Sequence, residues 1–502
     1  MSQAIVGVSR IHGRWAGLLG LVVLGAAPAF VLLAHERSFG HLWLTLGSVL
    51  AAAAVGTVPA MRREIRQWFH DVWRLAATNS ASAFKARTRL AFLLVVWPAA
   101  CFMLAWPKSL AMGDSWPVVP TAVALTTQGS LELTSQAASA PPAYFVDGLP
   151  YCLRHTPHGV YSGYPQGMVP FAVPTVWAAA AVRAPLDANR CRRFLERWTA
   201  TWITALTLGL FFLIALELTL PVSALVATAF LGLGSALLTT NSQALWQQTG
   251  IAFWTLLIVL IEFRHARRPV SGGFVIQGFA AAMMLACRPS AMVILVPLAG
   301  WRLFHDPRRT SAALLVAGLL FLPWAMLNLN IYGTPVGPTL LTQWRRDAWT
   351  QISAESLAGV LVSPGRGLLT YQIWIIAPLL AWMMRTPASP RVGPQGWMAC
   401  FTTIIVLEAL LTAVWGVWWG GTCWGSRLLA DVVPLAGLLV VPALGRLVQG
   451  RYYGTLAALG VAAIVTHWPA LCTPALALSV DPSDSAHLWD WSCPPYLAFL
   501  RR

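Results

Sequence analysis

The fold follows from the apolar run LAFLLVVWPAACFMLAW, residues 90–106, and from the polar stretch Gly113-Asp114-Ser115-Trp116-Pro117 that comes soon after it. The run is long enough to cross the hydrocarbon core of a bilayer as one helix. The polar stretch opens the longest segment of the chain without a helical pattern. A carboxylate just beyond a membrane helix is costly to keep unless it has a role, so Asp114 is the first functional candidate.

The composition of the chain favours a membrane protein. Its 502 residues are 57% hydrophobic and 10% charged, and the mean hydropathy is +0.64. Soluble domains carry about 25% charged residues, so this chain belongs in lipid. A structure that spans lipid must satisfy its own backbone hydrogen bonds, which leaves helices or a closed barrel. Because the apolar runs are continuous rather than alternating, they predict an all-α polytopic membrane protein.

The excess of basic residues has a membrane explanation. The formal net charge is +16. Lys and Arg gather in the cytoplasmic loops of membrane proteins. No basic patch occupies a water-soluble domain of its own, so we expect no nucleic-acid partner. The first apolar run, Trp15–Ala34, lacks a convincing small-residue cleavage site, so we expect it to remain as a helix rather than to be removed as a signal peptide.

The apolar runs predict about thirteen membrane spans. Two of them precede the run at 90–106, and a basic amphipathic cytoplasmic segment, Met61–Arg89, follows these two. We divide the chain into an N-terminal part (1–89), a membrane core (90–444), and a last span with a short periplasmic tail (445–502). Besides the run at 90–106, the predicted spans are Trp15–Ala34, Leu42–Ala60, Thr199–Leu218, Leu220–Leu238, Gly250–Phe263, Phe274–Cys287, Ser290–Phe304, Ser311–Leu327, Gly367–Met384, Cys400–Val417, Leu428–Leu444 and Gly454–Ala470.

The run Gly167–Val182 is short and contains Pro170 and Pro174. If it crossed the membrane, the later basic loops Arg264–Arg268 and Arg302–Arg309 would lie outside, against the positive-inside rule. We therefore predict a juxtamembrane helix at the outer surface, within a large periplasmic loop over 107–198.

This topology gathers the uncommon polar side chains on the outer face, where they suit sugar transfer from a lipid donor. Asp114 can remove the proton of an attacking hydroxyl. The arginines Arg288, Arg366 and Arg427 can hold the phosphate of a lipid leaving group. Aromatic and amide side chains can bind the sugar, and the candidates are Tyr161, Tyr164, Trp246, Gln247, Gln248, Trp419 and Trp424.

Motifs in this part of the chain occur in the order of a known family. They are Gly113-Asp114-Ser115, Tyr161–Gly167, Leu245–Gln248, Arg288-Pro289, Asn328 with Tyr332–Pro335, Ser363–Leu369 and Trp419–Leu429. Together they resemble the GT-C superfamily of polyprenyl-phosphate-sugar-dependent glycosyltransferases, near the bacterial relatives of the protein O-mannosyltransferase and aminoarabinose-transferase group. The resemblance covers roughly Leu90 to Leu444.

The resemblance implies an inverting transferase in the bacterial inner membrane, with an active site that faces the periplasm. Asp114 would be the general base, the donor a polyprenyl-phosphate sugar held among membrane lipid, and the acceptor a glycan, lipid or protein. A nucleotide sugar or metal cofactor is not expected, and the protein would act as a monomer. Many relatives carry a second carboxylate after the first, whereas this chain has Ser115, and the spans before residue 90 are also extra.

Three alternatives stay open at this stage. Asp114 could cap a helix that begins near Trp116. Glu408, which falls within a predicted span, could serve a transporter or lipid flippase instead of an enzyme. The chain could also be a membrane scaffold without activity. A metal site is not expected, because His155 and His158 lack the partners that a ligand cluster needs.

Overall fold

The computed structural model describes residues 81–104, 113–140, 145–146, 148–338, 349, 353–386, 393–421, 423–472 and 488–497. The predicted spans Trp15–Ala34 and Leu42–Ala60, and most of the basic segment Met61–Arg89, lie outside these residues.

The apolar run that decides the fold is helical. Helix α4 (Ala81–Ala91), a π-helical turn (Phe92–Val96) and α5 (Trp97–Leu104) follow one another without a break. The π-helical turn comes just before Pro98, which has no backbone N–H to donate to the preceding turn, and such a local change of hydrogen bonding is a common accommodation of proline.

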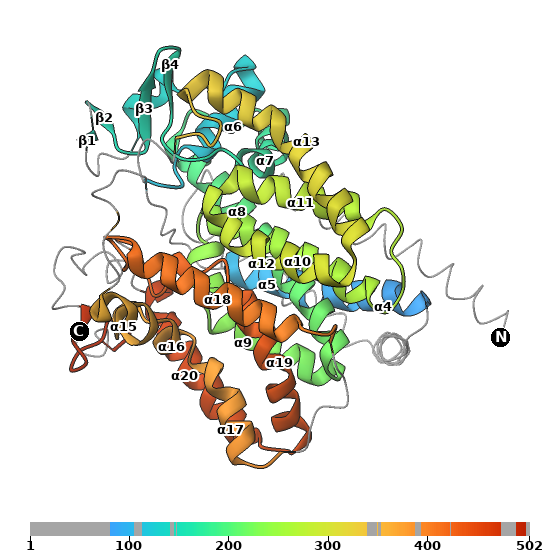
Figure 1. Cartoon of the computed structure of the whole chain (residues 1–502). Coiled ribbons are helices and arrows are strands. Elements are labelled where there is room, and N and C mark those ends of the chain that lie inside the picture. Colours follow the sequence, from blue (N-terminus) through green and yellow to red (C-terminus); the bar gives the residue numbers. More distant parts are fainter. Residues whose placement is uncertain are drawn as a thin grey trace, which may run out of the picture.

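The described residues form a mostly helical structure (Figure 1). Five helices are long and apolar enough to cross a membrane, as expected of a membrane protein: Ala86–Leu104, Asn189–Leu218, Pro307–Tyr332, Trp397–Val414 and Tyr453–Leu471. Shorter apolar helices are Val169–Ala181, Pro221–Leu233, Gly273–Cys287, Ile373–Met383 and Val433–Gln449. The count of about thirteen spans stays a prediction.

Helix α8 (Asn189–Leu218) lies at the centre, and α13 (Pro307–Tyr332) lies at the edge. The apolar part of α8 is 83% buried and that of α13 only 6%. Helix α8 packs against α9 (Pro221–Leu233) and α10 (Gln247–His265), whereas α13 packs mainly against α11 (Gly273–Cys287). The leucines of α13 are therefore exposed on the protein surface, where they would contact lipid in a membrane.

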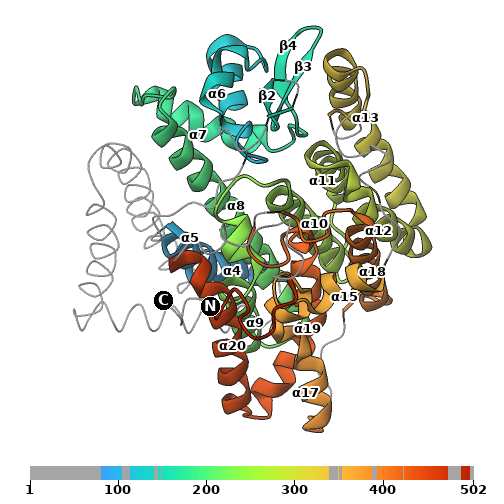
Figure 2. The same cartoon turned by 90° about the vertical axis from the view of Figure 1, so that its left-hand side faces the viewer.

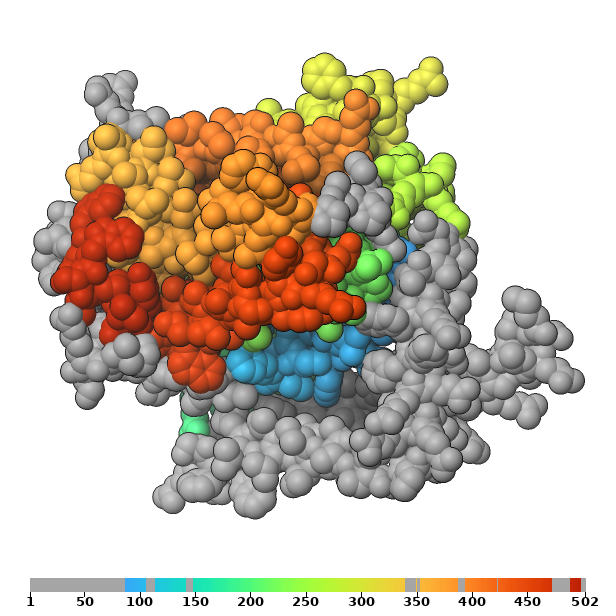
Figure 3. Space-filling view, turned by 90° about the horizontal axis from the view of Figure 1, so that it is seen from below, coloured from blue at the N-terminus to red at the C-terminus, as the bar shows by residue number. Residues whose placement is uncertain are grey.

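The C-terminal helices form a second group beside α9 and α12 (Met292–His305) (Figure 2). Viewed from below, this group covers much of the surface in orange and red, with α4 and α5 beside it in blue (Figure 3). Its members are α15 (Ala354–Val362), α16 (Leu368–Tyr371), a 3₁₀ turn (Ile373–Ile376), α17 (Ala377–Met383), α18 (Trp397–Val414), a 3₁₀ turn (Arg427–Leu429), α19 (Val433–Gln449) and α20 (Tyr453–Cys472).

The segment predicted as one large loop, 107–198, contains regular structure. It holds α6 (Val118–Gln128), a 3₁₀ turn (Thr134–Ser139) and α7 (Val169–Ala181), so the run Gly167–Val182 is helical as predicted, and its place beside the membrane stays a prediction. Two small antiparallel hairpins, β1 (Phe145–Val146) with β2 (Leu149–Pro150) and β3 (Leu153–Thr156) with β4 (Gly159–Ser162), depart from a purely α-helical fold.

The C-terminal boundary of that loop was wrong, because α8 already begins at Asn189. The arginines that suggested a solvated loop are partly packed into the protein. Arg192 donates to the carbonyl of Leu186 (2.8 Å), and Arg197 donates to the carbonyl of Met103 (2.8 Å). With local acceptors for their guanidinium groups, these arginines are compatible with a helix that continues into the bundle.

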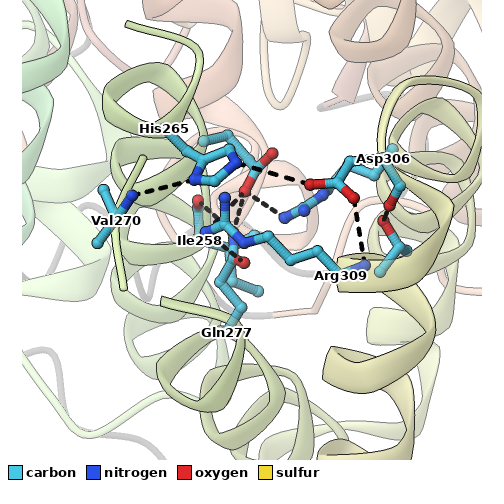
Figure 4. Close-up of polar contacts among 9 residues, drawn as sticks. Ile258, His265, Val270, Gln277, Asp306 and Arg309 are labelled. Carbon is cyan, nitrogen blue, oxygen red and sulfur yellow. Dashed lines mark hydrogen bonds and ion pairs between the residues drawn. The ribbon is translucent and has the colours of Figure 1, made fainter. Parts of the chain in front are cut away.

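Several helix ends meet in ion pairs at one end of the bundle. Arg87 and Arg267 both pair with Glu217, at 2.5 and 2.7 Å. A second cluster joins the ends of α10, α12 and α13 with the side of α11, and Figure 4 shows its contacts around Gln277 and Arg309. Described basic residues of three predicted inner loops, among them Arg87, Arg267 and Arg309, thus gather at one end of the bundle, which we call the basic end.

Candidate functional site

Asp114 lies in the turn before α6. The residue that caps this helix is Pro117, and no side chain makes a cap hydrogen bond there. The carboxylate is held in another way: Oδ1 accepts hydrogen bonds from the hydroxyls of Tyr151 (2.6 Å) and Tyr164 (3.0 Å), and Oδ2 accepts one from Arg427 Nη1 (3.0 Å). The helix-capping alternative for Asp114 is therefore wrong.

The β3–β4 hairpin brings the two tyrosines to Asp114. Tyr151 comes just before β3 and Tyr164 just after β4, and their rings meet edge to face with centroids 6.4 Å apart. Gly113 makes room for this contact, because a Cβ atom there would lie 2.5 Å from the Tyr151 hydroxyl. The Gly-Asp pair thus has a steric reason: the glycine admits the tyrosine that binds the neighbouring carboxylate.

Arg427 reaches Asp114 from the other end of the sequence. It follows a turn in which Gly420, Gly421 and Gly425 adopt positive φ, a conformation that favours glycine. Its guanidinium lies over the ring of Trp246, 4.4 Å from the centroid, which is a cation–π contact. Burial acts to lower the pKa of Arg427, but the combined effect of Asp114, which also accepts its hydrogen bond, and of the nearby Cys423 and Tyr164 raises it, so the guanidinium stays charged.

A cleft of about 260 Å³ adjoins the carboxylate, and we call it the Asp114 cleft. Tyr164 and Gln247, both candidates from the sequence, line it. Thr121 and Gln166 also line it, and neither was among the predicted site residues. Its remaining lining is largely apolar.

A second cleft, of about 200 Å³, lies on the other side of Arg427, and we call it the arginine cleft. Arg366 and Arg427 both line it, together with Trp418 and Trp419. The sequence therefore identified two arginines that the fold brings to one cleft from segments far apart in the chain.

Arg366 is buried without a carboxylate partner among the described residues. Its side chain donates to the carbonyl oxygens of Gly365 (2.8 Å), Trp419 (3.2 Å) and Gly421 (3.3 Å), and the residue is only 2% exposed. A buried cation is costly unless a negative charge compensates it. The site therefore suits an anion.

Further donors at the arginine cleft point to the same ligand class. Within the described part of the chain, Arg427 Nε, Ser426 Oγ and Trp419 Nε1 are buried and have no hydrogen-bond partner. Buried polar groups are normally paired. The Ser426 hydroxyl and the Trp419 indole, beside the two guanidinium groups, form a donor set that matches the oxygens of a phosphate.

Arg288, the third predicted phosphate ligand, is engaged elsewhere. Its Nη1 lies 3.4 Å from Asp431 Oδ2 and 4.0 Å from Glu408 Oε1. Neither of the two clefts is lined by Arg288. Glu408 is thus part of a buried cluster that includes a cation.

Four other candidates from the sequence line neither cleft, and one of them, Trp246, lies against the guanidinium of Arg427. Tyr161 packs edge to face on Tyr332, with centroids 6.4 Å apart. Trp424 is 1% exposed, and its indole donates to the carbonyl of Thr466 (2.9 Å). Gln248 is buried in the first turn of α10.

A second buried acid, Glu196, lies beside the Asp114 turn and was not among the predicted site residues. Glu196 Oε1 accepts a hydrogen bond from the backbone N–H of Leu245 (3.2 Å), and its carboxylate also bonds the Ser115 side chain. Glu196 therefore connects the turn that carries Asp114 with the segment that carries Trp246. Its position among four arginines suggested a solvated loop, which hid this role.

A scan of the chain against models of protein families finds no match, and a search of curated proteins finds none. The function must therefore be argued from the geometry of the two clefts and from the motifs.

Proposed function

We propose that the protein is a membrane glycosyltransferase. It moves a sugar from a polyprenyl-phosphate donor to a hydroxyl group of an acceptor, with Asp114 as the general base. The observation that carries this proposal is the Asp114–Arg427 ion pair, whose partners line different clefts. An acid on one side and two guanidinium groups on the other fit a hydroxyl nucleophile and a phosphate leaving group.

In this mechanism the acceptor hydroxyl lies in the Asp114 cleft. Asp114 takes its proton while the oxygen attacks the anomeric carbon of the donor. The bond between that carbon and the phosphate oxygen breaks, and polyprenyl phosphate leaves with the electron pair. Arg366 and Arg427 stabilise the charge that develops on the phosphate. A single displacement of this kind inverts the anomeric centre.

The ion pair also gives the order of events in this proposal. Without donor, Arg427 compensates the charge of Asp114 at 3.0 Å. A phosphate in the arginine cleft offers Arg427 a second anionic partner. As Arg427 turns toward the phosphate, an oxygen of Asp114 becomes available for the proton of the acceptor.

The proposal includes an orientation in the bacterial inner membrane. Helix α10 begins at Gln247, beside the Asp114 cleft, and ends at His265, in the basic end. Since basic loops favour the cytoplasm, the two clefts would face the periplasm. We propose a monomer that uses membrane lipid as donor carrier and needs no metal ion.

The alternative function, a transporter or lipid flippase that uses Glu408, makes a separate prediction. It requires that Glu408→Gln abolishes function while Asp114→Asn does not. The contact of Glu408 with Arg288 at 4.0 Å gives no specific support to transport.

The test is to incubate the purified chain in detergent or nanodiscs with a panel of radiolabelled polyprenyl-phosphate sugars and with membrane extract. We expect at least one donor to yield a labelled product whose anomeric configuration is opposite to that of the donor. Retention of configuration would exclude the single displacement. Absence of turnover with every donor, when the protein is folded, would count against the proposal as a whole.

A further inference from the structure

The Asp114 cleft contains two buried polar atoms that the described structure leaves without a partner. They are Gln166 Oε1 and Thr121 Oγ1. Both residues line the cleft, and they are 6% and 0% exposed. Because buried polar atoms are normally paired, two such atoms in one cleft indicate a ligand that supplies the missing hydrogen bonds.

The orientation of Gln166 is set by its neighbours. Its Nε2 donates to the hydroxyl of Tyr332 (3.0 Å), and this hydroxyl donates in turn to the carbonyl of Ser162 (3.0 Å). Since the tyrosine proton is used on Ser162, the tyrosine must accept from the amide nitrogen of Gln166. The oxygen of the amide is then the atom left for a ligand, and it requires a donor.

The backbone around Gln166 is also fixed. The N–H of the next residue, Gly167, donates to the carbonyl of Ala286 (2.9 Å), and a Cβ atom at 167 would lie 2.2 Å from the backbone nitrogen of Cys287. This close approach ties the segment to the end of α11. Gln166 is therefore held in place before any ligand arrives, as a specificity residue should be.

The rest of the lining restricts the charge and the shape of the ligand. Asp114 is the single charged side chain of the described lining, and Arg427 compensates its charge, so the lining itself offers no cation to an anionic ligand. Val118, Val169 and Leu245 add an apolar wall.

We propose that the Asp114 cleft is a carbohydrate site that selects a neutral sugar as acceptor. This inference rests on the proposed function. One sugar hydroxyl lies at Asp114 and is the nucleophile, and a second hydroxyl donates to Gln166 Oε1. Thr121 Oγ1 pairs with the same or a neighbouring hydroxyl, and the C–H face of the ring packs on the apolar wall. A serine or threonine of a protein offers a single hydroxyl and leaves Gln166 without this partner.

Binding can be measured without donor, which separates this inference from the proposed function. The probes are methyl glycosides of common hexoses and pentoses, and analogues in which one hydroxyl at a time is replaced by hydrogen. Saturation-transfer NMR on the purified full chain reports their affinity. We expect at least one methyl glycoside to bind, and one of its deoxy analogues to bind about tenfold more weakly, since one hydrogen bond is lost.

The variant Gln166→Leu should bind the parent glycoside about tenfold more weakly than the wild type does. It should also bind the parent glycoside and that deoxy analogue with equal affinity. The matched control is Gln136→Leu, because Gln136 is also buried with an unpaired Oε1 but does not line the cleft. The deoxy series on the wild-type protein keeps the test valid if Gln166→Leu does not fold.

Three results would overturn the inference: equal affinity of Gln166→Leu and wild type, equal affinity of all deoxy analogues, or transfer to a serine-containing peptide when no glycoside binds. Donor turnover is scored separately. Its absence would refute the proposed function, whereas glycoside binding that depends on Gln166 would still establish the sugar site.

Discussion

The Asp114–Arg427 ion pair gives a prediction that needs no substrate. We consider Arg427→Gln, which removes the charge and keeps a polar side chain of moderate length. The variant loses the 3.0 Å contact between Nη1 and Asp114 Oδ2, and it loses the cation–π contact with Trp246 at 4.4 Å. The two tyrosine hydrogen bonds to Oδ1 remain.

The size of the effect follows from burial. The side chains of Arg427 and Asp114 are 11% and 22% exposed, so the pair lies between a surface pair and a buried one. Surface pairs contribute about 0–1 kcal/mol, and breaking a fully buried pair costs about 3–5 kcal/mol. We therefore expect a coupling free energy of about 1.5–3 kcal/mol between the two side chains, the range for hydrogen bonds to charged groups.

The assay is a double-mutant cycle. The free energy of unfolding is measured in mixed detergent for the wild type, Asp114→Asn, Arg427→Gln and the double variant. The expected coupling stabilises the folded state, so the double variant is more stable than the sum of the single effects predicts. A coupling below about 0.5 kcal/mol would show that the two side chains do not interact in the folded protein, and the arrangement of the site would have to be abandoned.

Two further predictions concern the surroundings of the site. Gly113→Ala should reduce transfer about tenfold because its Cβ would displace the Tyr151 hydroxyl, whereas Gly300→Ala, with open space around it, should leave the rate unchanged; steady-state kinetics checks both. Glu196→Ala should destabilise the protein by about 2 kcal/mol in thermal unfolding, and Glu196→Gln by less, because Gln keeps an oxygen for the N–H of Leu245; equal losses would contradict this role.

The helices were largely predictable from the sequence, because continuous apolar runs have few other solutions in lipid. The errors occurred where polar residues lie on a helix. Asn189 and the arginines after it suggested a loop, although Arg192 and Arg197 find carbonyl acceptors inside the protein. The short hairpins were missed because each strand has too few residues for an alternating pattern to stand out.

The site was predictable where a motif carries the chemistry and not where the partner is distant in sequence. Asp114, Arg366 and Arg427 were identified by residue type and motif, and each of them lines one of the clefts. The sequence alone did not show whether Arg288 lines a phosphate site or pairs with an acid. Its partner Asp431 lies more than a hundred positions away in the chain. Gln166 lies in the motif Tyr161–Gly167. Its amide oxygen is left without a partner because its amide nitrogen donates to Tyr332, a contact that the motif does not show.

The central claim is that Asp114 accepts the proton of the attacking hydroxyl. The most direct measurement is the single-turnover rate of sugar transfer by Asp114→Asn, beside the control Asp187→Asn at an exposed acid of the same predicted periplasmic loop. We predict a loss of about 10²–10⁴-fold for Asp114→Asn, with the protein still folded, and no change for Asp187→Asn. Transfer by folded Asp114→Asn at the wild-type rate would contradict the account.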